Sequence, residues 1–384
     1  MAPAPGPPPR NPFRPTFGVS PTVLAGRSSL LTAFELGLAE GPGSPYRALI
    51  ISGARGVGKT VVLNELEDTA LRQGWVHLRA YPGPEMTATL VRTSIPELLD
   101  TLGSPTSRRM LTGGSIAGVG SVTAAADPAH RAPEPTLITR LREVARILAP
   151  RGAGVLITLD ELQSADPGHL HDLATAVQDL MRDNHDIAFV AAGLPAGVAD
   201  LLQQQGTTFL RRAHRVDLAG VAPAEASRLF ADTAESGGRT MSAEAVAEAV
   251  RLSHGYPYLM QVVGSMTWAQ ANLQGADALT AGHVRKVSGP AVERMGLQIH
   301  APSFQGVTGQ QMRLLYALAE LSPDNGPVRT GDIAARLGLV PNAISMAREA
   351  LLRRSLVVVP SYGHLQFALP YAAHHLLAHP HLRP

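Results

Sequence analysis

A glycine-rich octapeptide carries the clearest chemistry in this chain. Residues 53–60 read Gly-Ala-Arg-Gly-Val-Gly-Lys-Thr, which has the G-x-x-x-x-G-K-[ST] spacing of a phosphate-binding P-loop. Glycines let successive backbone N–H groups turn towards a phosphate chain, and a helix beginning at Lys59 points its positive dipole end at the same phosphates. Lys59 can reach the β- and γ-phosphates, and the Thr60 hydroxyl can bind Mg²⁺. The nucleotide-binding residues predicted here are Gly53, Ala54, Arg55, Gly56, Val57, Gly58, Lys59, Thr60 and Val61.

An acidic pair supplies the second half of the predicted site. The apolar run 154–159 reads as a strand buried on both faces, and it ends in Asp160-Glu161. Ligands bind at the carboxyl ends of the strands in parallel sheets, so this pair lies where a nucleotide would be held. Asp160 is predicted to hold Mg²⁺, and Glu161 to act as the general base that activates water. The alternative for these residues, a solvated strand end, is disfavoured by the P-loop upstream.

The elements needed to position these groups follow in order along the chain. Apolar runs typical of buried strands alternate with amphipathic stretches typical of helices, which predicts an α/β fold with a parallel sheet flanked by helices. The predicted strands cover 48–51, 76–80, 154–159 and 187–192, and the main predicted helices cover 28–39, 136–148 and 170–183. Ala192 and Gly193 close the 187–192 strand, where many P-loop ATPases carry a polar residue that senses the γ-phosphate. Such sensing from this position is therefore not expected.

Three further segments are candidates for the nucleotide site. Gly26 and Arg27 precede the first helix and could fold over the adenine, or could only cap that helix. Tyr256 and Pro257 join two helices and could form a lid loop over the base, or could only separate the helices. Arg212 is a candidate for the arginine that neutralises the γ-phosphate, in its own chain or a neighbouring subunit; the alternative is a solvated basic surface.

The C-terminal part reads as a winged helix. Three predicted helices, 310–321, 330–337 and 341–354, precede a predicted hairpin around Ser361-Tyr362-Gly363. The third helix would enter a major groove, with Arg353, Arg354 and His364 near phosphates. Basic residues are sparse here, so docking to a protein instead of duplex DNA stays open. The predicted DNA-binding residues are Asn342, Ser345, Arg348 and Arg353.

Composition sets the limits for all of these predictions. The 384 residues carry a net charge of +2, with 45% hydrophobic and 17% charged residues, which is typical of globular domains. Cysteine is absent from the sequence, which excludes disulfides, thiolate metal sites and thiol nucleophiles. No signal peptide pattern and no bilayer-length apolar run is present, so we expect a soluble cytoplasmic protein without a membrane contact.

Four regions are predicted along the chain. They are a disordered proline-rich tail at 1–20, a P-loop ATPase domain at 21–218 with an insertion loop at 103–135, a helical lid domain at 219–298, and a winged-helix domain at 299–384. The tail is predicted to be disordered or extended, because proline lacks a donor N–H and fixes φ, so no helix or central strand can form. The insertion is rich in Gly, Ser, Ala and Pro, and its length is typical of a functional or a mobile loop.

Taken together, these motifs resemble the AAA+/STAND-type P-loop ATPases, specifically the archaeal-type and origin-recognition-like ATP-binding proteins. The resemblance covers about residues 24–377. It implies ATP or ADP and Mg²⁺ as ligands, hydrolysis-linked movement of the lid and winged helix, and frequent homo-oligomerisation. We expect a slow or partner-stimulated ATPase that works as a switch on duplex DNA. The alternative is a nucleotide-bound signalling scaffold with a protein partner; a phosphotransferase fits less well, because no acceptor-site module is visible.

Overall fold

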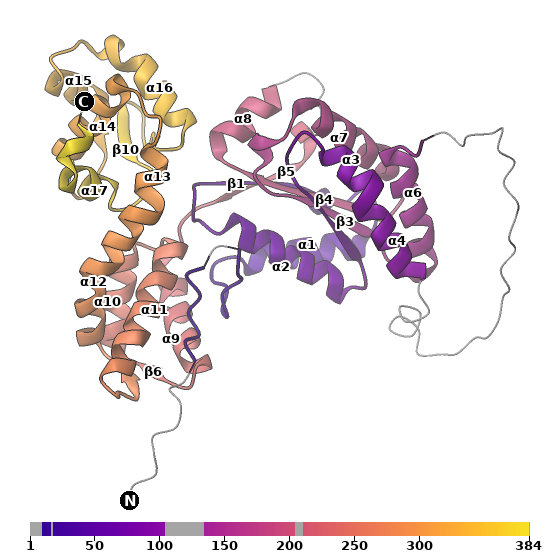
Figure 1. The fold of residues 1–384 in the computed structure, drawn as a ribbon, viewed down its shortest axis with the longest axis horizontal. Coiled ribbons are helices and arrows are strands. Elements are labelled where there is room, and N and C mark those ends of the chain that lie inside the picture. The colour runs from indigo at the N-terminus through magenta and orange to yellow at the C-terminus, as the bar shows by residue number, and fades with distance from the viewer. Residues whose placement is uncertain (1–9, 17, 104–133, 204–209, 384) are drawn as a thin grey trace, which may run out of the picture.

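The computed structural model describes residues 10–16, 18–103, 134–203 and 210–383. Within these residues, a parallel five-stranded sheet has the order β2-β3-β4-β1-β5 (Figure 1). Its strands are β1 (Ala48–Gly53), β2 (Val76–Ala80), β3 (Val155–Leu159), β4 (Ile187–Gly193) and β5 (His214–Leu218). In this order β4 lies between β1 and β3. The P-loop follows β1 and the acidic pair follows β3, so both lie at the carboxyl ends of the strands, with one strand between them.

Helices cover both faces of this sheet. Successive side chains of a strand point to opposite faces of a sheet, and in β1 both sets are apolar. Leu49 and Ile51 pack with the helices of one face, and Ile50 packs with those of the other. On one face lie α1 (Ser28–Glu40) and α2 (Lys59–Arg72). On the other lie α3 (Met86–Thr89), a π-helical turn (Leu90–Ser94), α4 (Ile95–Gly103), α6 (Leu137–Leu148), α7 (Pro167–Arg182) and α8 (Pro195–Gln203). The predicted P-loop NTPase fold class is confirmed.

A helical region follows β5. It consists of α9 (Pro223–Ser236), α10 (Ala243–Ser253), α11 (Pro257–Leu273) and α12 (Ala281–Met295), with a short parallel pair β6 (Thr240–Met241) and β7 (Ala278–Leu279). Side-chain caps begin α10 and α12, at Ser242 and Thr280. The four helices share one apolar core that is separate from the sheet cores. Neither α8 nor α12 was predicted from the sequence.

The C-terminal region is joined to α12 by a connector, which we define as residues 296–306. It contains a π-helical turn (Gly296–His300) and α13 (Ala301–Phe304). Beyond it lie α14 (Gly309–Leu321), β8 (Val328–Arg329), α15 (Thr330–Arg336), a 3₁₀ turn (Pro341–Ile344), α16 (Ser345–Arg353), β9 (Val357–Val358), β10 (His364–Phe367), α17 (Ala372–Ala378) and a last 3₁₀ turn (Pro380–Leu382). The predicted hairpin is present as the antiparallel pair β9–β10, with β8 on its other side. Identification of this region as a winged helix stays a prediction.

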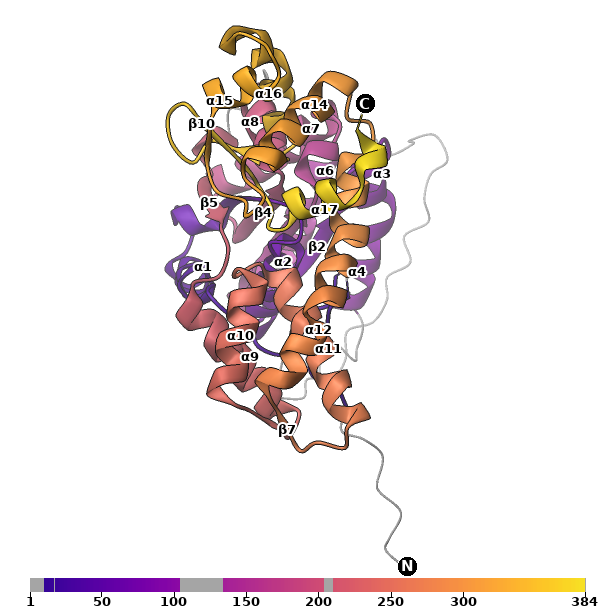
Figure 2. The same ribbon diagram turned by 90° about the vertical axis from the view of Figure 1, so that its left-hand side faces the viewer.

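The helical and C-terminal regions lie along one side of the sheet, and the C-terminal region is stacked above the helical region in the views of Figures 1 and 2. Across the described ranges no helix has the length and apolarity needed to cross a bilayer. The predicted domain boundaries stay predictions. Residues 104–133, which make up nearly all of the predicted insertion, lie outside the described residues.

Residues 10–16 belong to the tail that was predicted to be disordered or extended, and they pack against the helical region. Phe13 is only 3% exposed and belongs to the core of the helical region, where its ring centroid lies 6.2 Å from that of Phe230. A Cβ added to Gly264 of α11 would lie 2.2 Å from the Phe13 ring, so this glycine makes room for it. Proline excludes helix and sheet here, but an extended segment can still bury an aromatic side chain.

We predict that Phe13→Ala lowers the free energy of unfolding by about 3 kcal/mol, the usual cost of truncating a buried phenylalanine. Urea denaturation followed by circular dichroism measures this change. Arg10→Ala, an exposed residue of the same segment, is the control and should leave stability unchanged. A loss below about 1 kcal/mol for Phe13→Ala would contradict the packing of this segment.

Candidate functional site

The P-loop joins the carboxyl end of β1 to the first turn of α2. Gly56 and Gly58 have φ angles of 69° and 97°, in the left-handed region that favours glycine. Lys59 is 6% exposed, and its Nζ donates to the backbone oxygens of Gly53 at 3.0 Å and Ala54 at 3.2 Å. Burial lowers the pKa of Lys59, while the nearby carboxylates of Glu161 and Asp160 oppose this. A cation held in an anion-binding loop is suited to receive phosphate oxygens.

The acidic pair contacts the P-loop directly. Thr60 Oγ1 donates to Asp160 Oδ2 at 2.5 Å, although 100 residues separate the two in sequence. Hydroxyl and carboxylate oxygens are ligands that Mg²⁺ prefers, and a nucleotide-borne Mg²⁺ needs only one or two of them from protein. This donor set therefore fits the predicted ion, even though no cluster of three or more His, Cys, Asp or Glu was found among the described residues.

The backbone of Glu161 is left-handed, with φ 51° and ψ 45°. This conformation costs a non-glycine residue roughly 1–2 kcal/mol, and such strain is often found at functional sites. The Glu161 N–H donates to Asp160 Oδ1 at 2.8 Å, which helps to hold the turn. Glu161 also lines the cavity described next, so its carboxylate is available to a ligand there.

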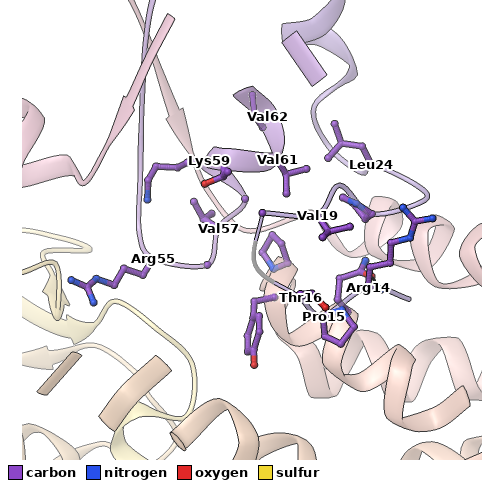
Figure 3. Close-up of a pocket in the computed structure, with 18 of the residues that line it drawn as sticks. Arg14, Pro15, Thr16, Val19, Leu24, Arg55, Val57, Lys59, Val61 and Val62 are labelled. Atoms are coloured by element: carbon purple, nitrogen blue, oxygen red, sulfur yellow. Dashed lines mark hydrogen bonds between the residues drawn. The ribbon is translucent and has the colours of Figure 1, made fainter. Parts of the chain in front are cut away.

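A cavity of about 570 Å³ opens beside the P-loop. This volume is within the range of small-molecule sites. Besides the P-loop and the turn that carries Glu161 and Ser164, three parts of the chain bound the cavity. The N-terminal segment contributes Arg14, Pro15, Thr16, Gly18, Val19, Pro21, Val23 and Leu24; the helical region and the linker before it contribute Val221, Leu229, Pro257, Tyr258 and Gln261; the connector contributes Gln298, Ile299 and Pro302. Figure 3 shows Val19 and Leu24 beside Val61 and Val62, on the opposite side of the loop from Arg55.

The predicted lid residues divide into two roles. Tyr256 does not line the cavity; its buried hydroxyl donates to the backbone oxygen of Arg55, and burial raises its pKa. The neighbouring backbone N–H of Tyr258 donates to the oxygen of Gly56 at 3.3 Å. A Cβ on Gly56 would lie 2.1 Å from the Tyr256 hydroxyl, so glycine is required there for this contact as well as for its φ angle. Pro257 does line the cavity, and its contact with a nucleotide base stays a prediction.

Gly26 and Arg27 also differ in position. Arg27 lines the cavity and donates through Nη2 to the oxygen of Ala219 at 2.7 Å, which ties the segment before α1 to the segment after β5. Burial lowers the pKa of its guanidinium, opposed by Glu225. Gly26 is outside the lining; a Cβ there would lie 2.8 Å from a Glu225 carboxylate oxygen. The absence of a side chain at Gly26 therefore leaves room for the Glu225 carboxylate, and Gly26 does not face the cavity.

Arg212 is far from the site in its own chain. It ends the turn before β5, and β5 pairs with β1 in parallel, with His214 opposite Leu49 and Leu218 opposite Gly53. The P-loop leaves the carboxyl edge of the sheet and Arg212 lies at the amino edge, about 16 Å away at roughly 3.3 Å per residue. Of the two predicted alternatives, this position disfavours a role for Arg212 at the nucleotide of its own chain. A role in a neighbouring subunit stays a prediction.

Sequence reasoning missed the N-terminal wall of the cavity and Tyr258. Arg14 donates its backbone N–H to Gln261 Oε1 at 2.9 Å, and Asn64 of α2 donates to the oxygen of Gly18 at 3.2 Å. This segment therefore connects the helical region to the P-loop helix. The apolar residues Phe13, Val19 and Val23, spaced among the prolines, were the signal that a packed segment was present.

Comparison with known proteins supports this description. Residues 23–190 match a family described as an AAA ATPase domain, and residues 297–376 match a domain of unknown function (DUF8462). No curated protein matches the chain.

Among solved structures, the ORC2 protein of Aeropyrum pernix, in its ADPNP–ADP complexes, has a TM-score of 0.63 at 17% identity, covering 96% of each chain. The Walker-type ATPase PABY2304 of Pyrococcus abyssi has a TM-score of 0.60 at 16% identity, covering 92% of this chain and 96% of that one. At such identities these likenesses show the fold.

We predict that Gly56→Ala weakens nucleotide binding by about tenfold or more, because the added methyl group must displace the Tyr256 hydroxyl and strain the loop backbone. Isothermal titration with ATP measures the affinity. Gly83→Ala is the matched control: a Cβ there meets nothing within 4 Å, so its affinity should equal that of the unsubstituted chain. Equal affinities for both variants would contradict the contact between loop and Tyr256.

Proposed function

We propose, from the premise that this chain is an AAA+ P-loop protein with the fold of the archaeal origin-recognition type, that it is an ATP-hydrolysing molecular switch. The observation that carries this proposal is the 2.5 Å contact between Asp160 and Thr60, and Thr60 also lines a cavity of about 570 Å³. It supports a triphosphate lying along the P-loop with its ion at the hydroxyl–carboxylate pair.

Each residue of the loop then has a task. The N–H groups of the loop donate to phosphate oxygens, and Lys59 exchanges its two backbone partners for the β- and γ-phosphates. When bound, Mg²⁺ neutralises charge on the same oxygens. Glu161 accepts a proton from water as the water oxygen bonds to the γ-phosphorus, and the bond to the β–γ bridging oxygen breaks to give ADP and phosphate.

Coupling to the C-terminal region is supported by the connector. Gln298, Ile299 and Pro302 line the same cavity as the P-loop, and the Tyr258 hydroxyl is hydrogen-bonded to Gln298. At its far end, Arg354 donates to the connector oxygens of Gly306 at 2.9 Å and Gln305. A nucleotide that moves the connector would therefore also move α16. The Arg354 guanidinium is hydrogen-bonded to these backbone oxygens, so its predicted contact with phosphate would compete with them.

We predict that Lys59→Ala weakens ATP binding at least about 100-fold, because the loop loses its buried cation. Lys286→Ala removes an exposed lysine from α12 and serves as the control. Isothermal titration with ATP and Mg²⁺ compares the variants. Unchanged affinity in Lys59→Ala would contradict the nucleotide site.

Glu161→Gln should bind ATP normally but turn it over at least about 100-fold more slowly, since an amide is not a base. Phosphate release measures turnover, and sizing the same variant with ATP by light scattering tests the predicted homo-oligomer, in which Arg212 would serve a neighbour. Retained turnover would remove Glu161 from the mechanism.

We further propose that the C-terminal region is a winged helix that binds duplex DNA. Asn342 and Ser345 are exposed at the start of the α16 segment, Arg348 is half-buried, and Arg353 is exposed with its guanidinium 3.3 Å from Glu349. An exposed ion pair of this kind is weak and can be exchanged for a phosphate contact.

A specific observation favours a second candidate, docking to a protein. Val340 is 68% exposed, Met346 is 84% exposed and Tyr362 is fully exposed, on the turn before α16, on α16 itself and on the β9–β10 hairpin. Exposed apolar side chains of this size are common at protein interfaces. A protein partner would pack on them, whereas DNA would use the polar groups beside them.

Salt dependence separates the two candidates. A DNA switch should lose duplex affinity steeply as salt rises, and Arg353→Ala should reduce the slope of log K against log salt by about 1. Fluorescence anisotropy with labelled duplex, with ATP or ADP, makes the measurement. Leu273→Ser, which changes an exposed residue at the end of α11, is the control and should leave DNA affinity unchanged. The absence of salt-sensitive binding in every nucleotide state would favour the protein-docking candidate.

A further inference from the structure

The carboxyl end of β4 has a polar group that does not come from β4. Ala192 and Gly193 offer no side-chain donor or acceptor at this place, as the sequence indicates. The carboxamide of Gln163 lies there instead. Its Oε1 accepts the backbone N–H of Leu194 at 2.9 Å, and its Nε2 donates to Glu161 Oε2. One side chain therefore joins the candidate general base to the end of a neighbouring strand.

The local backbone explains how Gln163 reaches this position. The left-handed conformation of Glu161 turns the chain sharply after β3, and the Ser164 N–H closes the turn onto the Glu161 oxygen at 2.7 Å. Two glycines leave space for the returning side chain. A Cβ on Gly193 would lie 2.7 Å from Gln163 Oε1, and a Cβ on Gly197 of α8 would lie 2.3 Å from Gln163 Cβ. A side chain at either glycine would therefore collide with Gln163 in its present position.

We propose that Gln163 is a positioning residue for Glu161, which it holds by one carboxylate oxygen so that the other can accept a proton from water. This inference rests on the proposed ATP hydrolysis and adds a residue to it. Glutamine suits the task because its amide donates to Glu161 and accepts from Leu194 at the same time. A donor to one oxygen restricts the rotamers of the carboxylate and leaves the other oxygen to face water. Gln163, in the turn after β3, thus supplies the polar side chain that is missing at the carboxyl end of β4.

The same side chain leads away from the nucleotide. Leu194 is followed directly by α8, and α8 lies against α16 of the C-terminal region (Figure 1). A displacement of Glu161 on hydrolysis would therefore reach the first turn of α8 through two hydrogen bonds of Gln163. This route is separate from the connector.

Gln163→Glu is the decisive variant, because a carboxylate still accepts from Leu194 but cannot donate to Glu161. We expect its turnover to fall about tenfold or more, with ATP affinity within about twofold of the unsubstituted chain. Gly197→Ala should also slow turnover by displacing Gln163. Gln203→Ala, an exposed glutamine at the end of α8, is the control and should turn over normally.

Hydrogen exchange at the Leu194 amide gives a second readout that does not depend on turnover. Protection should persist in Gln163→Glu and be lost in Gln163→Ala. Normal turnover in Gln163→Glu, or a Leu194 amide unprotected in the unsubstituted chain, would overturn the role of Gln163 and leave the proposed hydrolysis intact. An unsubstituted chain that does not hydrolyse ATP would overturn the proposed function itself, and the positioning role with it.

Discussion

The contact between the Thr60 hydroxyl and the Asp160 carboxylate is the constraint on which the rest of this structure depends. It requires that the first turn of α2 and the end of β3 meet at one edge of the sheet, which the order β3-β4-β1 provides. Parallel strands direct all their carboxyl ends to that edge, together with the positive end of α2. Opposite charges are thereby collected where an anionic ligand and a divalent ion would meet.

Around this contact the cavity is assembled from segments far apart in the chain. The P-loop is supported through its backbone oxygens by Tyr256 and Tyr258 of the helical region. The N-terminal segment is anchored by Phe13 in that same region and forms another wall. The connector forms a third wall and ends at α16 through Arg354. Because the walls belong to different regions, a ligand in the cavity would contact residues of each region.

At the carboxyl end of β4, a polar side chain is supplied by a residue that lies elsewhere in the chain. Gln163 follows the acidic pair, yet its carboxamide lies at Leu194, in the space left by Gly193 and Gly197. Side chains on turns can exchange such roles because the sheet fixes where the turns meet, while the turns themselves are free to vary. The absence of a polar residue on one strand is therefore weak evidence about the chemistry of the site.

The sequence by itself determined the local features: the P-loop, the acidic pair, the strands at 48–51, 76–80, 154–159 and 187–192, and the hairpin after α16. These are contiguous patterns whose periodicity and residue types specify local backbone structure. Only the tertiary structure decided which edge of the sheet each residue occupies. In it, Arg212 lies at the opposite end of β5 from the P-loop, and Phe13 of the proline-rich segment is buried. The Gln163 carboxamide lies at the backbone N–H of Leu194. Sequence spacing reports neither strand order nor the burial of distant side chains against each other, and these depend on packing between elements.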